Sequence, residues 1–260
     1  MEAFKTILLT IDETMAQLTI NQPESLNVLS QAMMAELSEA IEILENTSGV
    51  RILIIKGAGQ KAFVAGANIK EMRDFTPEEA YEFSVDGNDV FARLAGLPIV
   101  SIAAVNGYAF GGGFELAQAA DLRIASSNAV VGHPETGLGI IPAYGGTQRL
   151  SRLVGIAKAK ELIFTGRQIK AEEGLAMGLF NKVVAAEALD DAVMEMAQAV
   201  IKNAPNSVAS AKIAIDQGFD MKLAQGLELE ARLFGKQYES ANQKIGMGGF
   251  LEKREANFLS

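Results

Sequence analysis

The spacing of apolar and polar residues predicts an alternation of strands and helices along most of the chain. Residues 6–11 and 16–21 form a predicted strand pair around a turn at 12–14. A helix is expected to begin near Ser30, because apolar side chains then recur at helical spacing. Its apolar face consists of Met33, Leu37, Ile41 and Leu44. The later segments are a strand at 52–56, a helix at 77–94, a strand at 99–105, a helix carrying Glu115 and a strand at 122–125. The alternation predicts an α/β fold.

The C-terminal part of the chain has a different pattern and is predicted to be mainly helical. Helices are expected at 191–202, 207–217 and 222–238. Because no Pro/Ser-rich linker precedes them, we expect an appendage rather than an independent domain. The predicted division is 1–190 for the core that carries the active site and 191–260 for the C-terminal helical region. An apolar stripe in this region is by default interpreted as a contact within the chain; it comprises Leu223, Leu227, Phe234 and Tyr238, with Glu230 among them.

Composition and charge narrow the functional classes. The 260 residues are 49% hydrophobic and 21% charged, so the chain can bury a large core. A net charge of −9 disfavours binding to nucleic acid, which depends on clustered Lys and Arg. Residues 94–114 carry no charge, and this run is long enough to suggest a membrane span. Its Gly, Pro, Ser and Asn residues argue against such a span and favour a buried strand that leads into a turn. The absence of cysteine excludes thiol nucleophiles and disulfides and is compatible with the expected cytoplasmic location.

Two glutamates follow segments suited to an active site. Glu115 comes directly after the triplet Gly111-Gly112-Gly113, and Glu135 follows His133-Pro134. Glycines allow unusual dihedral angles, and the first amides of a helix have no acceptor within it, so they can bind an oxyanion. An alternative role for Glu115 is to complement the helix dipole, worth up to about 1 kcal/mol. The two carboxyls together predict an acid/base pair.

A second turn made of small residues lies at 61–72, after the apolar run 52–55. Two such turns can each supply one N–H to a single oxygen, as an enolate-like transition state requires. His133 is the single histidine, and no Gly-x-Ser-x-Gly turn exists to support a serine triad. We therefore expect His133 to be a hydrogen-bonded residue of a loop or pocket wall.

Three motifs resemble one known family. They lie at 65–72, at 106–116, and at 134–142 with its continuation 145–150. In this order they resemble the signatures of the crotonase superfamily, specifically its enoyl-CoA hydratases, and the resemblance covers almost the whole chain. It implies a spiral of strand–strand–helix units followed by C-terminal helices that build homotrimers or homohexamers.

The resemblance also implies roles for individual positions. The amides of Ala67 and Gly112 would form an oxyanion hole for the thioester oxygen of an acyl-CoA. Glu115 would help as general base towards water, and Glu135 would deliver a proton to the alpha carbon. Ala143, where the family usually has glycine, would present its amide to the water. The residues expected to bind substrate and CoA are Ala65, Ala67, Asn68, Ile69, Lys70, Gly112 and Ala143.

Several further expectations follow from the same resemblance. Lys70 is a candidate partner for the CoA phosphates, with a solvated helix lysine as the alternative. Asn68 replaces the usual aspartate, and a bulky Phe114 is expected to narrow the site. No metal or cofactor is expected, since coenzyme A is part of the substrate. Aromatic residues on the 77–94 helix could touch the acyl chain, but packing in the core is favoured for them; they are Tyr81, Phe83 and Phe91.

The expected activity is hydration of a trans-2-enoyl-CoA to a 3-hydroxyacyl-CoA. The first alternative is a double-bond isomerase or another acyl-CoA enzyme of the superfamily. The presence of both Glu115 and Glu135 favours hydration, because family isomerases often lack one of them. A catalytically silent acyl-CoA-binding subunit is the third alternative, and ligand binding without turnover would support it.

Overall fold

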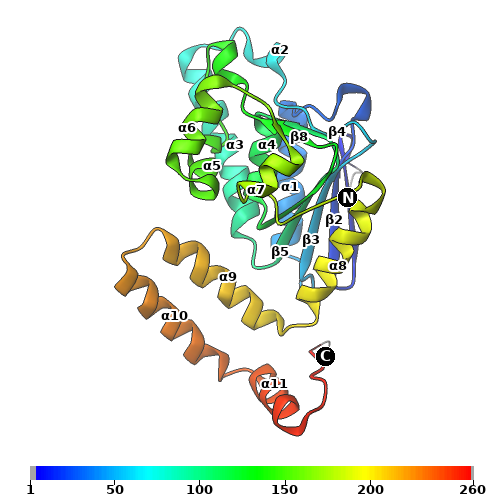
Figure 1. Cartoon of the computed structure of the whole chain (residues 1–260), viewed down its shortest axis with the longest axis vertical. Coiled ribbons are helices and arrows are strands. Elements are labelled where there is room, and N and C mark those ends of the chain that lie inside the picture. The colour runs from blue at the N-terminus through cyan, green and yellow to red at the C-terminus, as the bar shows by residue number, and fades with distance from the viewer. Residues whose placement is uncertain (1–3, 259–260) are drawn as a thin grey trace. The chain divides into compact units, whose positions relative to one another are not determined.

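The computed structural model describes residues 4–258 and contains two β-sheets (Figure 1). The chain divides into two compact units. One unit runs to Leu97 and continues over Ser101–Val193, and the other comprises Pro98–Val100 and the chain from Met194 onward.

The larger sheet has six strands in the order β1-β2-β3-β5-β7-β10. Its strands are β1 (Ile7–Asp12), β2 (Met15–Ile20), β3 (Ile52–Gly57), β5 (Val100–Val105), β7 (Leu122–Ser126) and β10 (Lys182–Val184). β1 pairs antiparallel with β2, whereas β2 with β3, β5 with β7 and β7 with β10 are parallel. All six residues of β5 are buried, which explains the long uncharged run in the sequence.

The smaller sheet has four strands in the order β4-β6-β8-β9. They are β4 (Ala62–Val64), β6 (Tyr108–Phe110), β8 (Val130–Gly132) and β9 (Ile169–Lys170). Each of the pairs β3/β4, β5/β6 and β7/β8 sends its first strand to the larger sheet and its second to the smaller one. Because the chain passes from the larger sheet to the smaller one in each pair, it forms a spiral of strand–strand–helix units.

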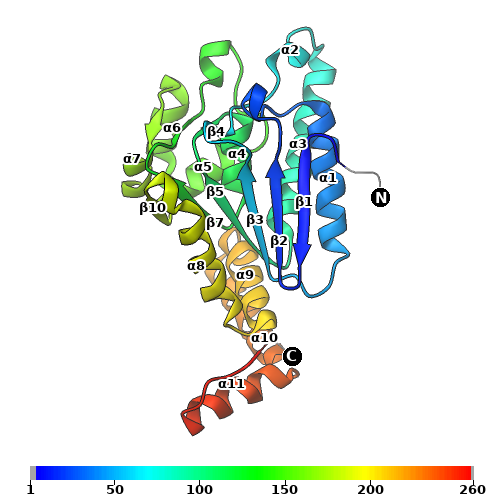
Figure 2. The same ribbon diagram turned by 90° about the vertical axis from the view of Figure 1, so that its right-hand side faces the viewer.

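In the first unit, α1 and α3 begin where the sequence predicts, and α4 carries Glu115 as expected. The elements are η1 (Pro23–Ser25), α1 (Gln31–Glu45), α2 (Ile69–Met72), α3 (Pro77–Gly96), α4 (Gly112–Ala119), η2 (Glu135–Leu138), α5 (Gly146–Val154), α6 (Ile156–Thr165), α7 (Ala171–Ala176), η3 (Ala186–Ala188) and the start of α8 (Leu189–Ile201). Ser30 caps α1 by accepting from the Met33 amide, and the four predicted apolar positions of α1 are buried. Thr76 and Glu79 form a capping box at the start of α3. α1 packs against β1 and α3 beside the larger sheet (Figure 2).

The short strands of the smaller sheet differ from the sequence-based expectation. The sequence predicts a turn between the buried strand at 99–105 and the helix that carries Glu115, but Tyr108–Phe110 forms β6 within it. Likewise β4, at Ala62–Val64, lies inside the expected turn at 61–72. Three residues are too few for a period-2 pattern to be recognised, so pairing with neighbouring strands decides their conformation.

The second unit is helical. After the end of α8 it contains α9 (Pro205–Phe219), α10 (Leu223–Gln237) and α11 (Ala241–Glu252). Gln237 joins α10 to α9, since its side chain accepts from Asn206 Nδ2 at 2.8 Å and donates to Ser210 Oγ at 2.8 Å. The three predicted helices correspond to α8, α9 and α10. No helix among residues 4–258 combines the length and apolar character needed to cross a membrane.

The apolar stripe on α10 is exposed, so its interpretation as a contact within the chain is wrong. Leu223 is 78% exposed, Leu227 55%, Phe234 62% and Tyr238 51%. The spacing correctly indicates one face of a helix. Periodicity alone cannot say whether that face meets the same chain or another molecule.

Candidate active site

Both predicted catalytic glutamates line one cavity of about 120 Å³ in the first unit. The wall is formed by the turn after β4, the start of α4, the loop that contains η2, and the loop before α5. Seven of the residues expected at the site line this cavity, namely Ala65, Ala67, Ile69, Gly112, Glu115, Glu135 and Ala143. Asn68 and Lys70 are not among its lining residues.

The glycine triplet lets α4 start against the smaller sheet. Gly111 has φ 48° and ψ −123°, a conformation that disfavours side chains. A Cβ at Gly113 would overlap the main chain of Val64, so α4 can approach β4 only with glycine there. This packing buries Glu115, in the first turn of α4, to 1% exposure.

Main-chain amides fix one oxygen of Glu115. Its Oε1 accepts from the N–H of Tyr144 at 2.8 Å and from the N–H of Gly146 at 2.7 Å. The sequence motifs did not single out these two donors. They come from a loop 29 residues or more further along the chain, and no local pattern shows that its amides face a carboxylate.

The loop that carries these amides is itself held from two helices. From α3, Ser84 Oγ donates to the Ala143 carbonyl at 2.6 Å and Asn88 Nδ2 donates to it at 2.8 Å. From α5, Arg149 Nη1 donates to the Tyr144 carbonyl at 2.7 Å. Ala143 is not one of the described residues with positive φ, so the backbone there accepts alanine in place of glycine.

Glu135 is held more loosely. It begins the short helix η2 and is 8% exposed. Its Oε1 lies 3.4 Å from Nδ1 of His133, and its buried Oε2 has no hydrogen-bond partner among residues 4–258. Gly111 leaves room for the carboxylate, because a Cβ there would lie 3.0 Å from Oε1.

His133 is a buried, hydrogen-bonded residue of the site. It is 1% exposed, and its Nε2 lies 3.0 Å from Nε2 of Gln118 on α4. This confirms the expectation of a satisfied histidine and adds a contact with Glu135 that the sequence did not indicate. Phe114 packs its ring 4.9 Å from the imidazole and does not line the cavity, so the expectation that it narrows the site is wrong.

Burial raises the pKa of Glu115 above its ordinary value, because a charged carboxylate loses water there. The nearby His133 and the two amide donors oppose this rise in pKa, whereas the charge of Glu135 adds to it. A carboxyl whose pKa is moved towards neutrality can both accept and donate a proton. The arrangement therefore suits proton transfer in a site largely shielded from water.

The main chain leaves the amide of Ala67 available to a ligand. Leu29 pairs with the residues on either side of Ala67: its N–H donates to Gly66 O at 2.8 Å, and its carbonyl accepts from Asn68 N at 2.8 Å. The N–H of Ala67 therefore faces away from Leu29. Gly112 is the first residue of α4, so its N–H has no acceptor within the helix.

Asn27 is a further supporting residue that the sequence did not reveal. Its buried amide nitrogen donates to the carbonyls of Ala62 and Phe63, at 3.1 and 3.2 Å, and its own backbone has φ 58°. It thereby fixes β4, which leads into the turn at Ala67. Asn before a helix is a common turn residue, so its type alone carries no signal of this contact.

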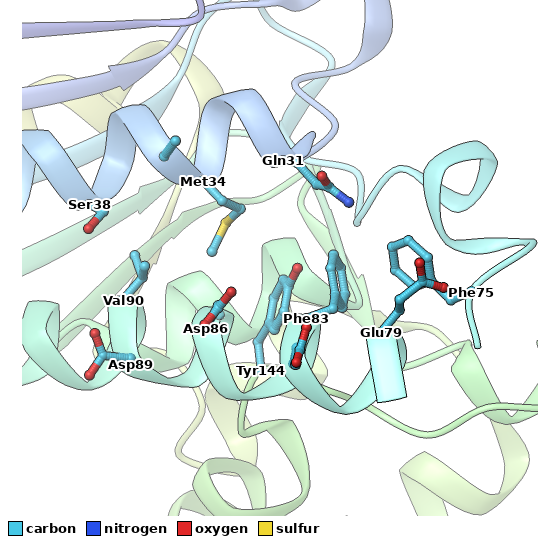
Figure 3. Close-up of a pocket in the computed structure, with 13 residues that line it drawn as sticks. Gln31, Met34, Ser38, Phe75, Glu79, Phe83, Asp86, Asp89, Val90 and Tyr144 are labelled. Carbon is cyan, nitrogen blue, oxygen red and sulfur yellow. The ribbon is translucent and has the colours of Figure 1, made fainter. Parts of the chain in front are cut away.

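Two aromatic rings separate the cavity from a larger one. Phe83 and Tyr144, with ring centroids 5.0 Å apart, line both the small cavity and a second cavity of about 550 Å³ between α1 and α3. Figure 3 shows the two rings next to each other, with Met34 and Asp86 close to Tyr144. Packing in the core is confirmed for Phe91, which is fully buried, whereas Phe83 lines the cavity and Tyr81 is 71% exposed.

Asn68 and Lys70 belong to the start of α2. Asn68 Oδ1 accepts from the amide of Lys70 at 3.2 Å and caps the helix, and its Nδ2 donates to Glu71 Oε1 at 2.8 Å. Asn68 thus supports the turn that carries Ala67. Lys70 is exposed beside it.

The sequence and the fold match known proteins over nearly their full lengths. Residues 10–260 match the family described as Enoyl-CoA hydratase/isomerase. This chain belongs to that family. A short-chain-enoyl-CoA hydratase from Clostridium acetobutylicum is 46% identical, covering 96% of this chain and 95% of that protein. A crotonyl-CoA hydratase from Syntrophomonas wolfei is 43% identical, with 99% of each chain covered. An enoyl-CoA hydratase structure from Bacillus anthracis matches with a TM-score of 0.93 at 36% identity, covering 98% of this chain and 99% of that one.

Membership of the enoyl-CoA hydratase/isomerase family confirms the resemblance to the crotonase superfamily. The structural match confirms the α/β fold with a C-terminal helical region. The chain is therefore an enzyme of this family.

Proposed function

We propose that this enzyme adds water to a trans-2-enoyl-CoA and gives a 3-hydroxyacyl-CoA. The observation that carries the proposal is the pair of buried carboxyls, Glu115 and Glu135, that line one cavity beside two turns with available amides. Relatives named short-chain-enoyl-CoA hydratase and crotonyl-CoA hydratase support the same reaction.

The thioester oxygen is bound by the N–H groups of Ala67 and Gly112. Negative charge develops on this oxygen when water adds to the double bond, and preorganised amides stabilise it without reorientation. Loss of one such donor typically costs about 10²–10³-fold in rate. The support for this assignment is that both residues line the cavity and that the N–H of Ala67 is directed away from its neighbour Leu29.

The two glutamates divide the proton transfers. Glu115 accepts a proton from the water whose oxygen bonds to the beta carbon, and Glu135 donates a proton to the alpha carbon. Two carboxyls in one cavity do not ionise together easily, so one stays protonated near neutral pH. The raised pKa of Glu115, caused by burial, brings that carboxyl closer to the working pH of a base.

The remaining contacts to the acyl-CoA come from residues around the cavity. Ala65, Ile69 and Ala143 line it. Ala65 and Ile69 contact the acyl and thioester part, and Ala143 presents its amide to the reacting water. Lys70 binds a phosphate of coenzyme A; the support is its exposed position on α2, whose start is capped by Asn68. The reaction needs no other cofactor.

We further propose that the chain forms a homotrimer or homohexamer in the cytoplasm. The exposed apolar residues of α10 support an interface with another copy, because such side chains gain stability when they leave water. The absence of cysteine is compatible with a reducing compartment.

Isomerisation is the second candidate activity. It moves a proton between two carbons and requires no added water, so one carboxyl suffices for it. The presence of both Glu115 and Glu135 in the cavity favours hydration.

The test follows loss of the conjugated enoyl-thioester absorbance with crotonyl-CoA. Wild type is compared with Glu115→Gln and Glu135→Gln, after each is shown to be folded and to have the same oligomeric state. We expect rapid loss in wild type and a fall of about 10²–10⁴-fold in each variant. Binding of crotonyl-CoA and longer enoyl-CoAs without loss of absorbance would contradict hydration and favour an isomerase or a silent binding subunit.

A further inference from the structure

The two glutamates share an asymmetry between their oxygens. Oε1 of Glu115 accepts from the amides of Tyr144 and Gly146, and Oε1 of Glu135 lies 3.4 Å from His133 Nδ1. Oε2 of Glu135 is buried without a partner, and no bond to Oε2 of Glu115 occurs within residues 4–258. In each carboxyl group the protein contacts one oxygen, and the other oxygen is free to exchange a proton with the substrate or water.

The hydrogen on the imidazole of His133 is assigned by its second partner, Gln118. Their Nε2 atoms lie 3.0 Å apart, and the two side chains are 1% and 5% exposed. An amide nitrogen can only donate, so Nε2 of His133 must accept. A neutral ring then carries its hydrogen on Nδ1, which faces Oε1 of Glu135.

The opposite orientation of the Gln118 amide is less favourable. Its Oε1 is buried and has no partner among the described residues. Exchanging the amide oxygen and nitrogen would place the amide nitrogen, with both of its hydrogens unpaired, at that point in place of one unpaired oxygen. It would also make Nε2 of His133 the donor and leave Nδ1 as an acceptor facing Oε1 of Glu135, which is an acceptor as well. Two buried acceptors that face each other are unfavourable.

The ring of His133 is confined from two sides. Phe114 packs at a centroid distance of 4.9 Å and an interplanar angle of 37°. On another side the main chain of Gly146 approaches so closely that a Cβ there would lie 2.5 Å from Cε1 of the ring. The imidazole therefore has little room to swing away from Glu135.

We propose that His133, held by Gln118, is a positioning residue that keeps Oε1 of Glu135 as an acceptor and confines the transferred proton to Oε2. This inference rests on hydration as the proposed function. In the forward reaction the O–H bond at Oε2 breaks, its proton forms the new C–H bond at the alpha carbon, and its electron pair stays on the carboxylate. The water oxygen bonds to the beta carbon while Glu115 takes the proton from water. Exchange with solvent then returns both carboxyls to their starting states.

The first test reads the tautomer directly. His133 is the only histidine, so the whole enzyme labelled with ¹⁵N-histidine gives the signals of one imidazole in solid-state NMR. We expect a protonated Nδ1 and an unprotonated Nε2 in wild type, and a change in the Nδ1 signal in Glu135→Gln. In Gln118→Leu we expect a mixture of tautomers. A wild-type ring protonated only at Nε2 would overturn the proposal.

The second test is kinetic and uses variants that differ in one donor. In His133→Asn the side-chain amide nitrogen occupies about the position of Nδ1, whereas His133→Leu has no donor there. With crotonyl-CoA we expect His133→Leu to lower kcat about ten- to a hundredfold with little change in KM, the size of one hydrogen bond to a charged group. His133→Asn should restore most of kcat. Equal losses in the two variants, or full activity in His133→Leu, would contradict the proposal.

The two tests separate the possible failures. If His133→Leu does not fold, Gln118→Leu replaces it, and an unchanged tautomer together with an unchanged kcat then overturns the proposal. If wild type leaves crotonyl-CoA unchanged, the proposed hydration fails. The contact between His133 and Glu135 is still tested in that case by the ¹⁵N signals.

Discussion

The two sides of the small cavity are built in different ways. On the Glu115 side a carboxylate in α4 is held by two main-chain amides, and the loop that supplies them is bound to α3 and α5. On the Glu135 side the carboxylate begins a four-residue helix and has one side-chain contact of 3.4 Å. That helix ends in Leu138, which is 58% exposed, and is followed by Ile140 and Ile141, which are 41% and 67% exposed.

The difference shows how one enzyme can combine a fixed group with a more adaptable one. A main-chain N–H remains when the side chain of its residue is replaced. The Glu115 side is therefore sensitive mainly to changes in the volume of the side chains around it. The Glu135 side depends on particular side chains and lies next to a loop that can meet substrate or another molecule. Substitutions that change side-chain volume, backbone conformation or charge should therefore affect the two sides differently.

Of the two glycine substitutions, Gly146→Ala should have the larger effect, because it crowds the Glu115 side. The new Cβ would lie 2.9 Å from Glu115 Oε1 and 2.5 Å from His133 Cε1, so both groups must move. A displacement of about 1 Å in a catalytic group can cost about a hundredfold, and we expect kcat with crotonyl-CoA to fall by that order. Gly137→Ala is the control, since nothing lies within 4 Å of its Cβ. Equal activities would show that the Glu115 side is not closely packed.

Gly111→Ala should disturb the Glu135 side by a smaller factor. Its Cβ would lie 3.0 Å from Glu135 Oε1, which a loosely held carboxylate can relieve by moving a few tenths of an ångström. We expect kcat to fall about tenfold, together with a loss of about 1–3 kcal/mol in the free energy of unfolding from the positive φ of 48°. Urea denaturation and crotonyl-CoA kinetics measure the two effects. A larger kcat loss than in Gly146→Ala would reverse the proposed order of rigidity.

Phe83→Ala should change the choice of substrate rather than the chemistry. Removing the ring joins the small cavity to the larger one, so longer acyl chains gain apolar surface to contact. We expect the ratio of kcat/KM for a six- or eight-carbon enoyl-CoA to that for crotonyl-CoA to rise about tenfold. Tyr81→Ala on the same helix is the matched control, because Tyr81 is 71% exposed and lines neither cavity. An unchanged ratio would show that the acyl chain does not extend from the small cavity past Phe83 into the larger one.

Glu115→Gln should stabilise the protein at neutral pH although it lowers activity. Burial raises the folded-state pKa of Glu115 above its ordinary 4.5, so the folded state binds a proton more tightly than the unfolded state. The free energy of unfolding therefore decreases as pH rises from about 4.5 through the raised pKa, by about 1.4 kcal/mol for each pH unit that separates the folded and unfolded pKa values. Glutamine has no charge to bury, so the free energy of unfolding of Glu115→Gln does not fall in this way. We expect its melting temperature to exceed that of wild type by a few degrees at pH 8, about 2–4 °C per kcal/mol, and the gap to close towards pH 4.

The control for this prediction is Glu82→Gln, which changes an exposed carboxyl on α3. Melting temperatures are measured at one protein concentration, because assembly also changes them. A gap between Glu115→Gln and wild type that does not depend on pH would show that charge burial is not its cause.

Most of the core elements follow from the local pattern. The apolar face of α1 and the starts of α1 and α3 appear where the sequence indicates them, because each depends on residues within a few positions. The strands of the smaller sheet were not predicted, since three residues such as Tyr108–Phe110 gain their conformation from partners far away in the chain. The exposure of the apolar stripe on α10 was also missed. Helical spacing shows which residues share one face of a helix, but it does not show what packs against that face.

The sequence by itself determined the fold class and the family and singled out Glu115 and Glu135, because residue types at fixed local spacing carry that information. Only the tertiary structure decided how Glu115 and Glu135 are held. The amides of Tyr144 and Gly146 on Glu115, and the chain from Gln118 through His133 to Glu135, join residues from separate elements. The direction of an amide or an imidazole depends on how those elements pack, and packing is a property of the whole chain.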